Sequence, residues 1–174
     1  MTKKDVAQII DVYISYYVAT TTILFSFVND PHLVDLLNRK GMDRGSMTRF
    51  GKRDDTYTKN YDVYGAIENV RNNKQYNLEM LGGLLMTIIS VIGDKLKQND
   101  YFEKTSELEF FRHIRNAISH GNQFYFKHNE PKRQAMFKNF EITASLQGKN
   151  CLFEFMSTGD VIELLEYTKN YLLK

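Results

Sequence analysis

Residues 77–97, NLEMLGGLLMTIISVIGDKLK, carry the strongest constraint on what this chain can fold into. Placed on a helix, the segment is apolar almost all round, so such a helix lies in the middle of a bundle or at a subunit interface. Gly82 and Gly83 each lower helix propensity by about 1 kcal/mol relative to alanine, which indicates that another backbone passes close by. Packing inside the chain and packing against a second copy both fit this pattern.

Helices are also predicted for most of the remaining chain. Apolar residues recur at three- and four-residue spacing in residues 4–29, and Pro31 is expected to open a short helix directly after it. Thr105 or Ser106 is a suitable N-cap for a later helix that Gly121 would end. The further helices are expected at about 62–75, at about 105–121, and in the C-terminal segment that follows the capping sequence STGD at 157–160.

One segment breaks the helical pattern. The runs FEITASL and CLFEF have period-two character and are joined by QGKN, which predicts a β-hairpin near residues 138–156. The predicted fold is therefore mainly α: an up-and-down helical bundle with this added hairpin and a C-terminal helix, forming one domain over residues 1–174.

Composition and charge exclude several classes of protein. The net charge of +2 is too small to indicate nucleic-acid binding from bulk electrostatics. Cys151 is the single cysteine; it rules out an intramolecular disulfide framework and, without a Cys/His cluster, argues against zinc, so we expect it half-buried in a strand. The apolar stretches at 16–28 and 78–92 are shorter than the roughly 20 residues of a membrane span, and the N-terminus lacks a signal peptide. These features predict a cytoplasmic protein that makes no membrane contact.

Residues 40–62 show no helical period and are expected to form a loop excursion. Basic and aromatic residues alternate in it, an arrangement that suits phosphate contacts and base stacking in single-stranded RNA. The aspartates of the segment offset much of this charge, so a solvated loop is the other interpretation. The residues are Arg44, Arg49, Lys52, Arg53 and Lys59, with Phe50, Tyr57 and Tyr61 between them.

The sequence RHIRNAISHGN at 112–122 is the candidate site. On a helical wheel the apolar residues around it form one arc, while Arg112, His113, Arg115, Asn116, Ser119 and His120 fill the other. Asn116 and His120 are four residues apart and can meet. Arg115 and His120 are five apart, about 140° round the wheel, so one chain cannot stack them. Two copies facing each other across a two-fold axis could surround one groove with two arginines and two histidines.

These residue types suit phosphodiester chemistry without a metal or any other cofactor. Arginine offers a fixed fork of donors to phosphate oxygens, and histidine exchanges protons near neutral pH. Asn116 could orient the imidazole of His120, while His113 is expected to be a solvated residue on the same stripe. The sequence predicts Arg115, Asn116 and His120 as catalytic residues, and as RNA contacts Arg112, Ser119, Asn122 and Lys127.

The stretch RNAISH at 115–120 resembles the R-x4-6-H signature of the HEPN superfamily (higher eukaryotes and prokaryotes nucleotide-binding domains). This resemblance implies a HEPN-like helical bundle, a homodimer with two motifs at its interface, and metal-independent RNA cleavage that leaves a 2′,3′-cyclic phosphate. It also implies a toxin–antitoxin or phage-defence context, with an antitoxin or another defence protein as a possible partner. In one toxin branch a tyrosine follows as H-x-Y; here Asn122 occupies that position, which argues against control through such a tyrosine.

Two further functions are consistent with the sequence. Some members of the superfamily have lost catalysis, so a dimeric interaction or regulatory module that binds RNA, a nucleotide or a protein is the main alternative. A DNA-binding protein that uses the basic loop is the other, although near-neutral charge and the lack of a helix-turn-helix pattern count against it.

Overall fold

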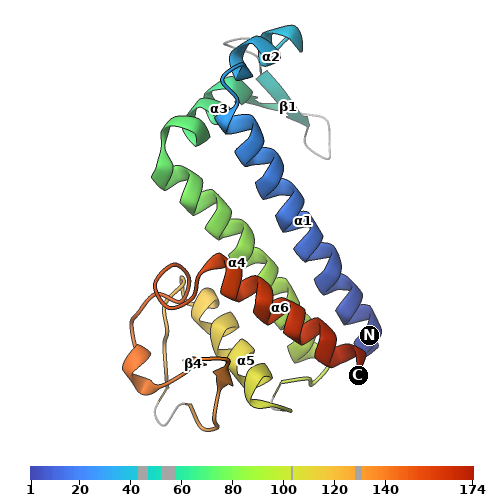
Figure 1. Ribbon diagram of the computed structural model, residues 1–174, viewed down its shortest axis with the longest axis vertical. Helices are drawn as coiled ribbons and strands as arrows, with labels where there is room; N and C mark the ends of the chain where they lie inside the picture. The colour runs from blue at the N-terminus through green and yellow to red at the C-terminus, as the bar shows by residue number, and fades with distance from the viewer. Residues whose placement is uncertain (43–46, 52–57, 103, 128–130) are drawn as a thin grey trace. The chain divides into compact units, whose positions relative to one another are not determined.

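The computed structural model describes residues 1–42, 47–51, 58–102, 104–127 and 131–174. Within them the chain forms six α-helices and two small antiparallel hairpins, which confirms the mainly helical fold with an added hairpin (Figure 1). The chain divides into two compact units: residues 1–18 with 82–174, and residues 19–81. Two long helices, α1 (Lys3–Asn29) and α4 (Lys74–Gln98), contribute residues to both units. The single domain expected from the length stays a prediction.

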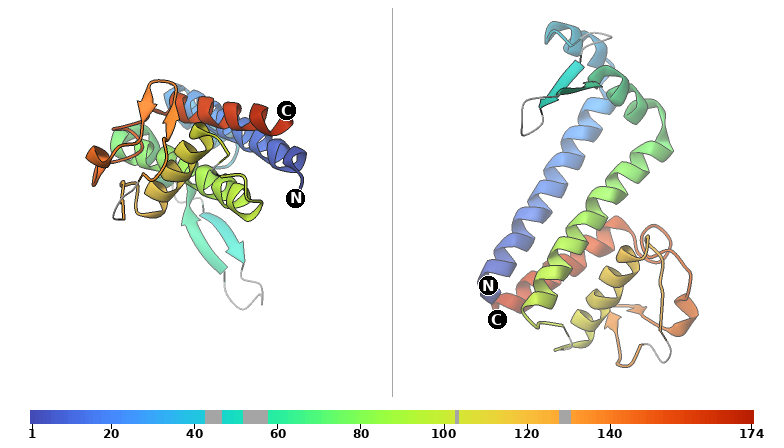
Figure 2. Two further views of the ribbon diagram at one scale, coloured as in Figure 1. Left: turned by 90° about the horizontal axis from the view of Figure 1, so that it is seen from below. Right: turned by 180° about the vertical axis from the view of Figure 1, so that it is seen from behind.

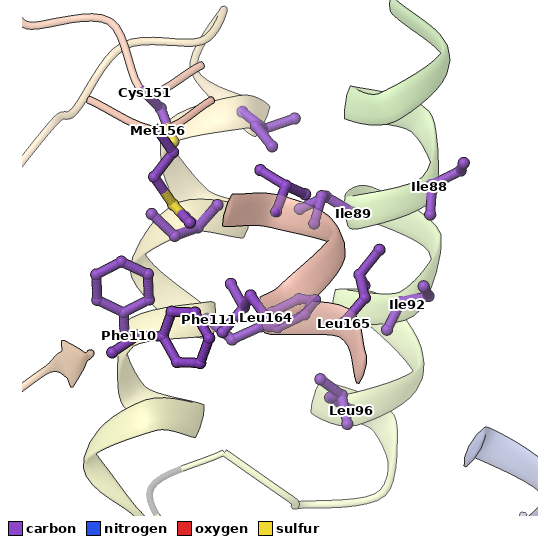
Figure 3. Close-up of a cluster of buried hydrophobic side chains, with 14 of the residues drawn as sticks. Ile88, Ile89, Ile92, Leu96, Phe110, Phe111, Cys151, Met156, Leu164 and Leu165 are labelled. Atoms are coloured by element: carbon purple, nitrogen blue, oxygen red, sulfur yellow. The ribbon is translucent and has the colours of Figure 1, made fainter. Parts of the chain in front are cut away.

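In the larger unit, four helices contribute to one apolar core, since the N-terminal part of α1 adds Val6, Ala7 and Ile10 to it. The C-terminal part of α4 lies beside α5 (Ser106–Ser119) and α6 (Thr158–Leu173), as both views in Figure 2 show. Their buried side chains meet in the cluster drawn in Figure 3, which includes Ile88, Ile89, Ile92 and Leu96 of α4, Phe110 and Phe111 of α5, and Leu164 and Leu165 of α6. Each such side chain contributes about 1.5–3 kcal/mol when it is fully buried. Packing within the chain therefore covers the C-terminal part of the apolar helix.

The helix ends follow the predicted capping residues. The hydroxyl of Thr105 accepts a hydrogen bond from the amide of Leu108 at 3.3 Å, which fixes the start of α5. Ser157 and Asp160 form a reciprocal capping box that starts α6. The N-terminal part of α1 packs on α6 in the same unit, since Lys169 pairs with Asp11 at 2.7 Å.

The glycine pair in α4 has a different basis from the one expected. A Cβ on Gly82 would lie 2.7 Å from the ring of Phe153, so a side chain and not a backbone approaches there. Gly83 has no atom within 4 Å of such a Cβ. Only the first glycine is therefore explained by close packing.

A hairpin forms at the start of the predicted segment 138–156, with its first strand before residue 138. The strands are β3 (Met136–Phe137) and β4 (Phe140–Glu141), joined at Lys138, which has a positive φ of 51°. Residues 144–146 form a short 3₁₀ helix, and the run CLFEF is not a strand. Cys151 and Leu152 are both buried while Phe153 is exposed, so burial there does not follow the period two of the letters, and the expected pairing was wrong.

In the smaller unit, the segment expected to be a loop contains a second hairpin. Strands β1 (Met47–Gly51) and β2 (Thr58–Asp62) pair antiparallel from Met47 opposite Asp62 to Gly51 opposite Thr58. The pattern gave no signal because neither strand has an alternating apolar face. Arg44, Lys52, Arg53 and Tyr57 lie outside the described residues, and so do the side chains of Arg49, Phe50 and Lys59; the RNA contact predicted here stays a prediction.

Two helices flank this hairpin in the chain. The first, α2 (Leu33–Arg39), begins two residues after Pro31, so the proline precedes the helix and is not its first residue. The second, α3 (Val63–Asn72), is capped by Asp62, whose carboxylate accepts a hydrogen bond from the amide of Gly65 at 2.9 Å.

Length and composition alone would let α1 and α4 cross a membrane. Both helices extend beyond the apolar stretches from which the opposite expectation was drawn. In the most apolar 18-residue window of each helix, 39% of the window is buried inside the protein in α4 and 11% in α1. The core helix of a soluble protein meets the same criterion, so this property is weak support for a membrane span.

Candidate functional site

Arg115 is held in place by the neighbouring helix α4. Its Nη2 donates to a carboxylate oxygen of Asp94 at 2.5 Å, and its Nη1 donates to Oδ1 of Asn116 at 3.3 Å. Its aliphatic stem lies over Gly93, where an added Cβ would come within 2.4 Å of the Cγ of the arginine. Gly93 therefore makes room for the stem, and Asp94 fixes the guanidinium.

Arg112 forms a second ion pair, within α5. Its Nε and Nη2 donate to the two carboxylate oxygens of Glu109, at 3.0 and 2.5 Å. Burial raises the pKa of Glu109, but the hydrogen bonds and charge of Arg112 outweigh it and hold that pKa below its usual value. Glu109 is 3% exposed, so this carboxylate is a buried partner of the predicted RNA-binding arginine.

His113 belongs to the buried face of α5 and not to the polar stripe. The residue is 3% exposed, and its ring packs edge-on against Phe126 with centroids 5.7 Å apart. Its Nε2 lies 3.0 Å from Nη2 of Arg112 and 3.4 Å from Oε1 of Glu109, so the tautomer of the ring decides which of the two it bonds. The expectation that His113 is solvated was wrong, because Glu109 and Arg112 provide polar partners inside the fold.

A pocket of about 240 Å³ opens on the side of α5 that faces α4. Arg112, Arg115 and Asn116 of α5 line it, so two of the predicted catalytic residues and one predicted RNA contact share one hollow. The other lining residues are Lys97, Asp100 and Phe102. The Nε of Arg115 is buried and has no hydrogen-bond acceptor within the described part of the chain.

His120 lies apart from this pocket, as the C-cap of α5. It is exposed, and its ring packs against the ring of Tyr125 with centroids 5.3 Å apart. Over the described residues, no hydrogen bond joins its imidazole to Asn116 or Arg115. The structure thus brings Arg115 and Asn116 together but leaves His120 separate. Tyr125, and not Asn116, contacts its imidazole.

The remaining predicted RNA contacts occupy different settings. The amide side chain of Asn122 bonds both the N–H and the carbonyl of Leu152, at 2.8 and 3.2 Å, with a positive φ of 67°; it anchors the 150–156 segment, which gives it a structural role. Ser119 is exposed and its hydroxyl donates to the carbonyl of Arg115. Lys127 is exposed, and His128, the next residue in the sequence, lies outside the described residues.

The helical wheel of α5 does not reveal the part of the site that α4 supplies. Asp94, which pairs with Arg115, lies 21 positions before it in the chain. The signal was present as GDKLK at 93–97, where charges follow directly on the apolar run, but only the fold shows that these residues face α5.

Burial raises the pKa of the Cys151 thiol to about 12, so this residue is not a nucleophile, and it lies outside any strand.

In the described ranges no three His, Cys, Asp or Glu side chains gather as they would around a metal ion. The motif side of α5 offers arginine donors in a pocket and a separate, exposed imidazole. No protein-family model, curated protein or solved structure matches this chain.

Proposed function

We propose that this protein is a metal-independent endoribonuclease whose active site forms between two copies of the chain. Arg115, Asn116 and His120 are its catalytic residues. The setting is a toxin–antitoxin or phage-defence system in the cytoplasm, where an antitoxin or another defence protein would restrain or trigger the enzyme.

The observation that carries this proposal is the separation of His120 from a preorganised arginine. Arg115 is fixed by Gly93, Asp94 and Asn116 and lines a pocket. His120 is exposed at the helix end without a hydrogen bond to either of the other two residues in the described chain. A second copy is the simplest source of an imidazole that faces Arg115, because a two-fold axis presents the same surface of both chains.

The proposed reaction needs no group beyond these side chains. One His120 accepts the proton of a ribose 2′-hydroxyl, whose oxygen attacks the adjacent phosphorus. The bond from phosphorus to the 5′-oxygen breaks, and the same imidazole, now protonated, returns that proton to the leaving oxygen. Arg115 stabilises the negative charge that builds on the phosphoryl oxygens. The products are a 2′,3′-cyclic phosphate and a free 5′-hydroxyl.

Mixing two inactive variants tests the composite site. Arg115→Ala and His120→Ala should each abolish cleavage of a labelled RNA in the presence of EDTA. After joint refolding, a mixed dimer retains one intact Arg115 and one intact His120 on opposite chains, so cleavage should return in part. Mixed samples that stay inactive would place both residues in one chain, and wild-type protein that leaves a broad set of RNAs intact would refute the nuclease.

One observation favours a second function, a non-catalytic dimeric module that binds RNA, a nucleotide or a protein. Both arginines of the motif are already paired with carboxylates of their own chain, Arg112 with Glu109 and Arg115 with Asp94. A phosphate would have to compete with those partners. This function predicts RNA or partner binding without cleavage, and binding that survives His120→Ala.

A further inference from the structure

The pocket beside the motif contains two charged residues to which the proposed reaction assigns no role. Lys97 is in the last turn of α4, and Asp100 follows the end of that helix with a φ of 55°. Both are exposed, and both line the pocket together with Arg112, Arg115 and Asn116.

The charge balance of the pocket makes Lys97 its available cation. Glu109 and Asp94 pair with the two arginines, while no carboxylate of the described chain lies within ion-pair distance of Lys97. A phosphate oxygen would suit the ammonium group of Lys97, because a charged donor bonds most strongly to a charged acceptor.

The other lining residues limit what can accompany the phosphate. Asp100 repels an anion but accepts hydrogen bonds, and so does the Oδ1 of Asn116, so hydroxyl groups are suitable partners. Phe102 is 8% exposed, so it leaves little open ring face on which a base could stack. The volume of about 240 Å³ is below the 300–1,000 Å³ range typical of sites for drug-sized ligands.

We propose that this pocket is a subsite for one ribose phosphate unit of RNA, in which Lys97 binds the phosphate and Asp100 accepts a hydrogen bond from the ribose 2′-hydroxyl. The inference rests on the proposed ribonuclease function and extends it to substrate recognition. The 2′-hydroxyl is the group that distinguishes RNA from DNA at a given position. The subsite would therefore select RNA without regard to base identity.

The test measures binding of a short fluorescent RNA, and of its 2′-deoxy counterpart, to the full chain carrying His120→Ala. Adding Lys97→Gln should weaken RNA binding and reduce the slope of log affinity against log salt by about 0.7, the value for one phosphate contact on a single strand. Lys95→Gln is the matched control, since it removes the same charge from the same last turn of α4 outside the pocket. Lys97→Arg should restore the slope. Equal slopes for Lys97→Gln and Lys95→Gln would overturn the phosphate assignment.

Asp100→Gly tests the ribose contact, because glycine accepts the positive φ of this position. Loss of the carboxylate should tighten binding of both oligonucleotides, but of RNA less, so the preference for RNA over the 2′-deoxy strand should fall. An unchanged preference would overturn the role of Asp100. Cleavage by the His120→Ala chain itself would refute the proposed catalytic mechanism, whereas the Lys97 and Asp100 binding data judge the subsite separately.

Discussion

Gly93→Ala separates the placement of Arg115 from its charge. Alanine in place of glycine inside a helix normally stabilises it by about 1 kcal/mol. At this position the new Cβ would lie 2.4 Å from Cγ and 3.0 Å from Cβ of Arg115. Those atoms are at the base of the side chain, so a change of the outer torsions cannot relieve the contact, and the arginine stem or the two helices must shift.

The size of the effect follows from two opposing contributions. Overpacking of this kind costs about 1–3 kcal/mol, which cancels or exceeds the gain in helix propensity. We therefore expect Gly93→Ala to leave stability unchanged or lower it by up to about 2 kcal/mol. Cleavage should fall at least about tenfold, because a displacement of about 1 Å can cost a hundredfold in rate.

Gly83→Ala is the matched control in the same helix. A Cβ there meets nothing within 4 Å, so the variant should be more stable by up to about 1 kcal/mol, or about 2–4 °C in Tm, with unchanged cleavage. Urea denaturation followed by circular dichroism gives the stabilities, and initial cleavage rates in EDTA give the activities. If Gly93→Ala is as stable and as active as Gly83→Ala, the close contact does not position Arg115 and the reasoning fails.

Three further predictions concern residues around the motif. The pKa of Glu109 is lowered in the fold, so its charged form stabilises the protein above the pKa of the unfolded chain, and that stabilisation is lost as the pH falls through the pKa of the folded state. Urea titrations at several pH values should therefore show less acid destabilisation for Glu109→Gln than for wild type. Equal pH profiles of stability would contradict the lowered pKa. Asn122→Ala leaves the backbone groups of Leu152 without partners and should cost about 1–3 kcal/mol, whereas Asn122→Gly should cost less because it keeps the positive φ; equal losses would show that the φ is unimportant. Cys151 should resist a thiol reagent at pH 8 in the folded protein and react in urea, with Cys151→Ala retaining cleavage; rapid labelling of the folded chain would refute its burial.

Periodicity and capping predicted the helices because both depend on neighbouring residues. Thr105, Ser157 and Asp160 start their helices as expected, since a cap needs a side-chain oxygen and an amide only a few positions away. The hairpins were harder: β3 and β4 are two residues each, too short for an alternating pattern. In 151–156 burial follows the hydrogen bonds to Asn122 and not a strand.

In the candidate site, too, the features that depend on one helix were predicted and the contacts between helices were not. A helical wheel separated Arg115 from His120 correctly in angle, because that depends only on α5. It misplaced His113, since burial of a polar residue depends on partners, here Glu109 and Arg112. It could not find Gly93, Asp94 or Lys97, whose relation to α5 arises only when two helices pack.

The contact between Gly93 and Arg115 also makes these two positions interdependent over evolutionary time. A larger residue at 93 would be tolerated only where position 115 carries a side chain without a stem in that place, and loss of the arginine would release the glycine. In related chains the two should change together, with Asp94 following the arginine. A signature built from GD on α4 and RN on α5 would therefore recognise relatives of this protein better than the R-x4-H spacing does alone.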